Sequence, residues 1–285
     1  MSTHLSWSPV DGRGHDVHLF RHPCAGVVEI RLESPAAPTF AIATLDALSD
    51  IFDMLSAEAR RGGAAPRYLL LTSASSGIFS MGGDLQTIAE LAAAQDRDGA
   101  RDYGRKAAHV IHRLYDGLGL GLVTTACVGG KAFGAGFEAV LACHRAVVRP
   151  NASFCLPESR FGLFPGMGAT SLLARRLGRD ATDTLLRERT VVTAADAFDR
   201  GLVAAVVDDP VASELADATA GGEGRWLQLR EAADDRRRRE GFTLDEVLDT
   251  TARWAERVVS MSQADLQALR RVARVQKARS GASAA

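Results

Sequence analysis

The hydrophobic and polar residues of the first part of the chain follow two different periods. Over residues 27–32 apolar and polar side chains alternate, which predicts a β-strand. Residues 43–61 carry apolar side chains at the spacing of an amphipathic helix, and Gly62 and Gly63 follow its end. Residues 67–73 form a continuous apolar run, as in a strand buried on both faces of a parallel sheet. This order of strand, helix and strand predicts an α/β fold.

The same patterns continue through the rest of the chain. A helix is expected after Leu85, then a polar loop or helix end over residues 95–101 and a second helix over residues 103–114. Strand-like apolar runs occupy residues 122–128, 146–149, 153–156 and 201–207. Helices are expected over residues 139–143, 171–177 and 181–186, after a cap at Thr193, and over 244–277 with a break near Ser260.

The segment 210–240 differs in composition from what precedes it. It is rich in Ala, Gly, Asp and Arg, and includes four consecutive arginines, Arg236 to Arg239. Such a run of like charge is typical of a solvated helix face or a mobile connector. We therefore expect an α/β core domain over residues 1–209 and a helical region over residues 210–285.

Composition narrows the range of partners. A net charge of −1 gives no attraction to nucleic acid or to an anionic membrane, and 6% aromatic residues are too few for stacking platforms. Cys24, Cys127, Cys143 and Cys155 lie in apolar surroundings without a CxxC pair, so we expect reduced core residues and no metal site. Neither a signal peptide nor a membrane helix is evident, which predicts a cytoplasmic protein.

Two glycine-containing segments each connect a strand-like run to a helix. They span residues 79–85 and 134–138. Such turns expose backbone N–H groups at a helix N-terminus, where the dipole favours negative charge. Two turns that face each other would form an oxyanion hole, although each alone is equally well explained as a plain tight turn. Neither has the sequence of a phosphate-binding loop or of a dinucleotide fingerprint.

Two glutamates near these turns are candidates for acid/base chemistry. Glu138 opens an apolar helix, so it is either a helix-cap residue or a buried catalyst. Glu158 lies in an apolar stretch between Phe154 and Phe161, where desolvation disfavours its charged form and suits general acid/base work. An ordinary loop carboxylate is the alternative for Glu158.

Taken together, these segments resemble the enoyl-CoA hydratase/isomerase (crotonase) superfamily over nearly the whole chain. The resemblance implies a spiral of ββα repeats with a C-terminal helical trimerisation region. It implies catalytic roles for Glu138 and Glu158, which keep the twenty-residue interval of the family's two glutamates. It assigns the oxyanion-hole N–H groups to Met81 and Ala135, and the N–H that holds the catalytic water to Gly166. Other pocket residues implied by the resemblance are Gly82, Gly83, Asp84, Gly134, Gly136, Met167 and Trp254.

The diffusible signal factor synthase branch of the superfamily is similar in more detail. The similarity covers residues 81–85, 136–139, 156–158 and 163–169, and the C-terminal helix pair with Trp254. It implies dehydration of a 3-hydroxyacyl thioester to a cis-2-enoyl product, followed by hydrolysis to a free fatty-acid signal. The chain departs from the branch at Ala135, where a glycine is usual, and matches it poorly over residues 216–239.

We therefore expect a dehydratase or hydratase of acyl thioesters that has no cofactor or metal of its own. Its substrate would be carried on CoA or on acyl carrier protein, and the carrier protein itself is a possible partner. The alternatives are a plain enoyl-CoA hydratase/isomerase and a non-catalytic acyl-thioester-binding protein. The resemblance also implies a homo-trimer or hexamer assembled through the C-terminal helices, whose apolar positions an intramolecular core explains equally well.

Overall fold

The computed structural model describes residues 5–7, 17–22, 26–34, 38–63 and 65–281. The strands are β1 (Leu5–Trp7), β2 (Val17–His22), β3 (Val27–Leu32), β4 (Tyr68–Ser73), β5 (Ile78–Ser80), β6 (Val123–Val128), β7 (Lys131–Phe133), β8 (Arg145–Val148), β9 (Ser153–Cys155), β10 (Val192–Thr193) and β11 (Ala205–Val206). The α-helices are α1 (Ile42–Arg60), α2 (Leu85–Ala94), α3 (Arg97–Tyr115), α4 (Ala135–Ala142), α5 (Ala169–Leu177), α6 (Arg179–Glu188), α7 (Ala194–Asp199), α8 (Pro210–Glu240), α9 (Leu244–Val259) and α10 (Gln263–Gly281). Two 3-10 helices, η1 (Gly117–Gly119) and η2 (Glu158–Phe161), complete the elements of the described residues.

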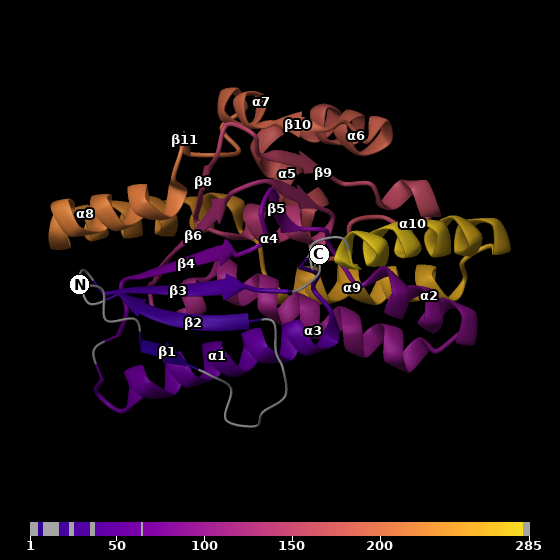
Figure 1. Cartoon of the computed structure of the whole chain (residues 1–285), viewed down its shortest axis with the longest axis horizontal. Coiled ribbons are helices and arrows are strands. Elements are labelled where there is room, and N and C mark those ends of the chain that lie inside the picture. The colour runs from indigo at the N-terminus through magenta and orange to yellow at the C-terminus, as the bar shows by residue number, and fades with distance from the viewer. Residues whose placement is uncertain (1–4, 8–16, 23–25, 35–37, 64, 282–285) are drawn as a thin grey trace.

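A seven-stranded sheet forms the centre of the molecule. Its order is β1-β2-β3-β4-β6-β8-β11, antiparallel from β1 to β3 and parallel from β3 onward. One set of side chains of β3 and β4 packs in the main core with α1 and α3, whereas Val27, Tyr68 and Leu70 belong to a second cluster that includes Ala218 of α8. Figure 1 shows α1 below the sheet and α8 above it. Because β4 is covered on both faces, its residues 68–71 are all apolar and buried rather than alternating.

A second, four-stranded sheet positions the functional segments. Its order is β10-β9-β7-β5, and β5, β7 and β9 run parallel to one another. The ends of parallel strands meet at the same edge of a sheet. The segments that follow β5, β7 and β9 therefore emerge side by side, and these are the two glycine turns and the segment that carries Glu158.

The predicted α/β class and the helical C-terminal region agree with this structure. The polar segment 95–101 is more ordered than expected, because α3 already begins at Arg97 with Asp96 as its cap, which accepts a hydrogen bond from the Gly99 N–H. The predicted strand 201–207 shrinks to the two residues of β11, since Leu202 and Val203 turn back onto α7 and bond the Ala197 carbonyl.

The arginine run behaves differently from the sequence prediction. Arg236 is not a solvated side chain: it donates to the carbonyls of Leu141, Cys143 and His144 and pairs with Glu240. These carbonyls belong to the end of α4 and the residues after it, where helical partners are missing. The run thus ties α8 to the end of α4. Arg238, two residues after Arg236, is exposed, as the sequence predicted for all four arginines, and pairs only within its own helix.

Residues on both sides of position 209 share one hydrophobic core. Phe242, Val247, Trp254 and Leu269 are buried in the same cluster as the strands and helices before α8. Position 209 itself is the cap of α8, whose Asp209 side chain accepts from the Ala212 N–H. Among the described residues, none of the helices combines the length and apolar character needed to cross a membrane.

We expect Arg236→Ala to destabilise the fold and Arg238→Ala to leave it unchanged. The first change removes donors from three carbonyls and leaves the buried Glu240 with one fewer cation, a loss of about 2–4 kcal/mol. The second removes an exposed ion pair worth less than about 1 kcal/mol. Urea unfolding of both variants measures the difference. Equal stabilities would show that the Arg236 contacts do not support the α4 end.

Candidate active site

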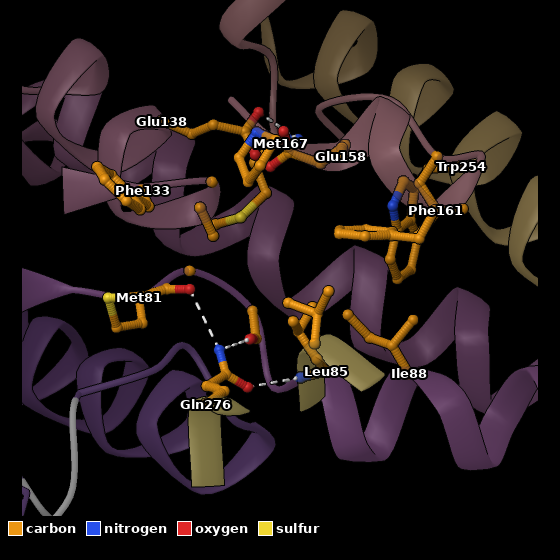
Figure 2. Close-up of a pocket in the computed structure, with 18 of the residues that line it drawn as sticks. Met81, Leu85, Ile88, Phe133, Glu138, Glu158, Phe161, Met167, Trp254 and Gln276 are labelled. Atoms are coloured by element: carbon orange, nitrogen blue, oxygen red, sulfur yellow. Dashed lines mark hydrogen bonds between the residues drawn. The ribbon is translucent and has the colours of Figure 1, made fainter. Parts of the chain in front are cut away.

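The three segments identified in the sequence surround one cavity of about 400 Å³ (Figure 2). Most of the predicted site residues line it. These are Met81, Gly82, Gly83, Gly134, Ala135, Glu138, Glu158, Gly166, Met167 and Trp254. Among the described residues no group of His, Cys, Asp and Glu side chains has the arrangement of a metal site. Besides the two carboxylates and the backbone, polar side chains of Tyr103, Arg160, Thr251 and Gln276 line the cavity.

Most of the remaining cavity wall is apolar, and much of it comes from helices. Its apolar side chains include Leu85 and Ile88 of α2, Ala107 of α3, Phe161 of η2, and Val272 and Val275 of α10. Trp254 of α9 packs flat against Gly166: a Cβ at that glycine would lie 2.8 Å from the indole ring. Such a wall suits the hydrocarbon part of a ligand better than a polar one.

Glu138 is held in one orientation by the start of a neighbouring helix. It lies in the first turn of α4 with 2% of its surface exposed. Its Oε1 accepts hydrogen bonds from Met167 N–H (2.8 Å) and Ala169 N–H (3.1 Å), at the N-terminus of α5. Burial raises the pKa of Glu138 to about 7, and the two N–H groups oppose the rise because they favour the ionised form.

Glu158 has fewer partners and a higher proton affinity. Burial and the nearby charge of Glu138 together raise the pKa of Glu158 to about 8. Its Oε2 is buried without a hydrogen-bond partner among the described residues. Its Oε1 lies so near Gly134 that a Cβ there would be 2.8 Å away, and Gly134 has φ +52°. Both the close approach and the backbone conformation require glycine.

The two glycine turns face each other across the cavity. A Cβ on Gly82 would lie 2.9 Å from the Phe133 carbonyl and 3.3 Å from the Ala135 nitrogen. Ala135 is the first residue of α4, and its N–H has no acceptor among the described residues. The alanine at this position therefore keeps a free backbone N–H beside the cavity.

The prediction that the Met81 N–H is the other free donor is wrong. The Met81 N–H donates to the Pro38 carbonyl at 2.9 Å, and the Gly82 N–H donates to Ser80 Oγ at 3.2 Å. The N–H of this turn that lines the cavity without an acceptor in the described part of the chain is that of Gly83. The N–H without an acceptor thus lies two residues after Met81, and the role of the turn as an oxyanion hole stays a prediction.

Asp84 and Gly136 were predicted as pocket residues but lie outside the cavity lining. Asp84 caps α2, and its carboxylate accepts from the N–H groups of Gln86 and Thr87. Gly136 lies inside α4 against Ser80, where a Cβ would come within 2.8 Å of that side chain. Both residues therefore shape the two turns rather than the surface that a ligand would contact.

Comparison with known proteins shows the family to which the chain belongs. The sequence model described as enoyl-CoA hydratase/isomerase matches residues 23–221. The chain belongs to this family. A carnitinyl-CoA dehydratase of Proteus mirabilis is 30% identical over 192 residues, which cover 67% of each protein. The alpha subunit of a fatty acid oxidation complex from Idiomarina loihiensis is 34% identical over 58% of this chain, and the match spans 23% of that longer protein.

The fold is shared with solved structures of the same family. An enoyl-CoA hydratase/isomerase from Xanthobacter autotrophicus Py2 superposes with a TM-score of 0.73 over 94% of this chain and 97% of its own, at 22% identity. The enoyl-CoA hydratase/isomerase fold, with its helical C-terminal region, is thus confirmed. A role of that region in trimer formation stays a prediction.

Sequence patterns alone did not identify two polar residues beside the cavity. Tyr103 of α3 donates to the Phe40 carbonyl (2.6 Å) and accepts from the Asp84 N–H (3.1 Å). Gln276 of α10 contacts the turn after β5. Tyr103 lies on a stripe of its helix whose other residues are typical of core packing, so its hydrogen bonds could not be predicted from the pattern. Gln276 is more than 190 residues away from its partners in the chain, so no local pattern could predict its contacts.

We expect Glu158→Gln to stabilise the folded protein at high pH. A folded-state pKa above the unfolded value gives stability that is present at low pH and is lost as pH rises through about 8. The amide cannot ionise, so the variant escapes this loss. Thermal unfolding at pH 4.5 and pH 8.5 tests it, with a Tm gain of at least about 2 °C expected at pH 8.5 and a clearly smaller one at pH 4.5, near the unfolded pKa. The exposed Glu188→Gln is the control, and an equal effect at both pH values would contradict the raised pKa.

Proposed function

We propose that this protein adds water to 2-enoyl thioesters and catalyses the reverse dehydration of 3-hydroxyacyl thioesters. The observation that carries the proposal is the pair of buried carboxylates at one end of an apolar cavity, with raised pKa values and unequal partners. Two carboxylates in different protonation states are what simultaneous acid and base catalysis requires. Membership of the family supports the same reaction class.

The thioester carbonyl would lie between the two glycine turns. In this arrangement the Gly83 N–H and the Ala135 N–H donate to the carbonyl oxygen, and the negative charge that develops there is stabilised as the enolate forms. One such donor typically contributes about 10²–10³ in rate. The helix dipole of α4 favours the same charge at Ala135, its first residue.

The unequal partners of the two glutamates assign their roles in hydration. Glu138, with two N–H donors, is ionised first and accepts a proton from the water whose oxygen attacks the β-carbon. Glu158, which keeps its proton longer, donates it to the α-carbon as the enolate collapses. Dehydration runs through the opposite protonation states, with Glu158 as base and Glu138 as acid. No further reactant is needed in either direction.

The apolar wall supports an acyl chain as the part of the substrate that enters the cavity. The wall formed by Phe161, Met167 and Trp254 would exclude water around the reacting carbons and strengthen the electrostatic contacts there. The Proteus mirabilis relative is named a carnitinyl-CoA dehydratase, so a CoA thioester is the carrier we propose first.

A second, narrower function is dehydration followed by release of a free unsaturated acid, as in the diffusible signal factor synthase branch. It is favoured by the unpartnered Oε2 of Glu158, which has room in its hydrogen bonding for a water. In this step water attacks the thioester carbonyl carbon, the C–S bond breaks and the thiol leaves with one proton. Ionised Glu158 would accept the proton of the attacking water, and the oxyanion would use the same two N–H groups.

We expect Glu138→Gln and Glu158→Gln each to lower kcat for hydration of crotonyl-CoA by about 10²–10⁴-fold, because each removes one proton-transfer group. The loss of absorbance of the conjugated thioester measures the rate, and thermal unfolding checks that the variants are folded. Glu188→Gln, an exposed glutamate on α6, should match the wild-type protein. Wild-type activity in either of the first two variants would contradict the acid/base pair.

The narrower function predicts release of free thiol from 3-hydroxyacyl thioesters. Supplied with 3-hydroxydecanoyl-CoA or the same acyl group on acyl carrier protein, the protein should release thiol and a 2-enoic acid in equal amounts. A thiol-reactive dye and mass spectrometry of the acid measure the two products. Enoyl thioester without free acid would leave the hydratase function in place and exclude the thioesterase step.

A further inference from the structure

The turn that carries the free Gly83 N–H is held by a residue from the far end of the chain. Gln276 Nε2 donates to the carbonyls of Met81 (3.2 Å) and Gly83 (3.0 Å), and its Oε1 accepts from the Leu85 N–H (3.2 Å). Figure 2 shows the side chain reaching up from α10 to the turn through these three contacts. The Gln276 amide thus both donates and accepts hydrogen bonds. A carboxylate could not donate, and an apolar side chain of the same length could do neither.

These contacts hold the two peptides on either side of the one that contains the Gly83 N–H. In a trans peptide the N–H is directed opposite to the preceding C=O. The Gly82 carbonyl accepts from Phe40 N–H at 2.8 Å, which directs the Gly83 N–H away from Phe40. The carbonyls before and after this peptide, those of Met81 and Gly83, are the ones that Gln276 holds. Glycines would otherwise leave the turn several conformations of similar energy.

Tyr103 supports the same turn from the opposite direction but does not replace Gln276. Its hydroxyl contacts the Phe40 carbonyl and the Asp84 N–H, so it fixes the end of the turn that enters α2. The carbonyls of Met81 and Gly83 have no other donor among the described residues.

The helix that carries Gln276 also touches the other half of the site. Val272 and Val275 of α10 line the cavity and are partly exposed at its edge. Asp265, near the start of α10, lies against Gly162, which ends the 3-10 helix that carries Glu158: a Cβ there would be 2.6 Å from its carboxylate. One helix therefore contacts both the oxyanion turn and the segment of the second glutamate.

We propose that Gln276 is a positioning residue that orients the Gly83 N–H toward the thioester carbonyl and makes this donor depend on the docking of α10. The inference rests on the proposed function, since it assigns Gln276 a part in the same reaction. It goes beyond that function by connecting the C-terminal helix to transition-state stabilisation rather than to substrate binding or to folding alone.

The test compares Gln276→Leu with Gln267→Leu, the same change at an exposed position of the same helix. We expect kcat for crotonyl-CoA to fall about 10²-fold in Gln276→Leu, as for a misplaced catalytic group, while KM changes less than about threefold. Gln276→Glu, which keeps the size but places a carboxylate opposite two carbonyls, should lose kcat in the same direction. If Gln276→Leu does not fold, Gln276→Glu takes its place.

A spectroscopic measurement separates positioning from a merely structural role. A 2,4-dienoyl-CoA absorbs at longer wavelength when its carbonyl is polarised by hydrogen bonds. Bound to Glu138→Gln forms, which are expected to turn it over slowly enough for the spectrum to be recorded, it should show a smaller shift when Gln276→Leu is added and an unchanged shift when Gln267→Leu is added.

The outcomes distinguish the two proposals. A wild-type protein with neither turnover nor a band shift overturns the proposed function and the inference with it. A wild-type protein with both, together with a Gln276→Leu variant that keeps kcat within about twofold of Gln267→Leu or keeps the full band shift, overturns the positioning role alone.

Discussion

Two carboxylates buried beside each other repel when both are charged, and each loses its hydration in an apolar cavity. The two glutamates differ in the hydrogen bonds that offset this cost. Glu138 receives two N–H groups from the start of α5, whereas Glu158 keeps an oxygen without a partner in the described structure. The same inequality separates the proton affinities of the pair. The feature that costs stability is therefore the one that prepares the pair for acid/base chemistry.

The small parallel sheet is what brings the reacting groups within reach of one another. The ends of β5, β7 and β9 lie in a row, and each is followed by a segment of the site. At two places the contacts are so close that only glycine fits: Gly82 against the Phe133 carbonyl and Gly134 against the Glu158 side chain. Glycine costs conformational entropy at such positions, and the hydrogen bonds around the turns limit that freedom in the folded state.

The sequence predicted what local patterns and family spacing determine. Strand–glycine–helix turns, the interval between Glu138 and Glu158, and the alternation of elements led to the fold and to the part of the cavity lining that carries the carboxylates and the turns. Residue order did not reveal which of three successive N–H groups is free, because this depends on Pro38 and Ser80 as acceptors. Nor did it reveal that Arg236 is taken out of solvent by carbonyls more than ninety residues away.

The C-terminal helices carry a larger share of the site than their place in the chain suggests. Trp254 of α9 closes the cavity against Gly166 and stacks on Tyr103 at 5.9 Å between ring centroids. Tyr103 in turn bonds the end of the turn that Gln276 holds at its middle. The apolar wall and the hydrogen bonds to the oxyanion turn are thus parts of one packed unit. A helical region that merely covered the α/β core would need the first and not the second.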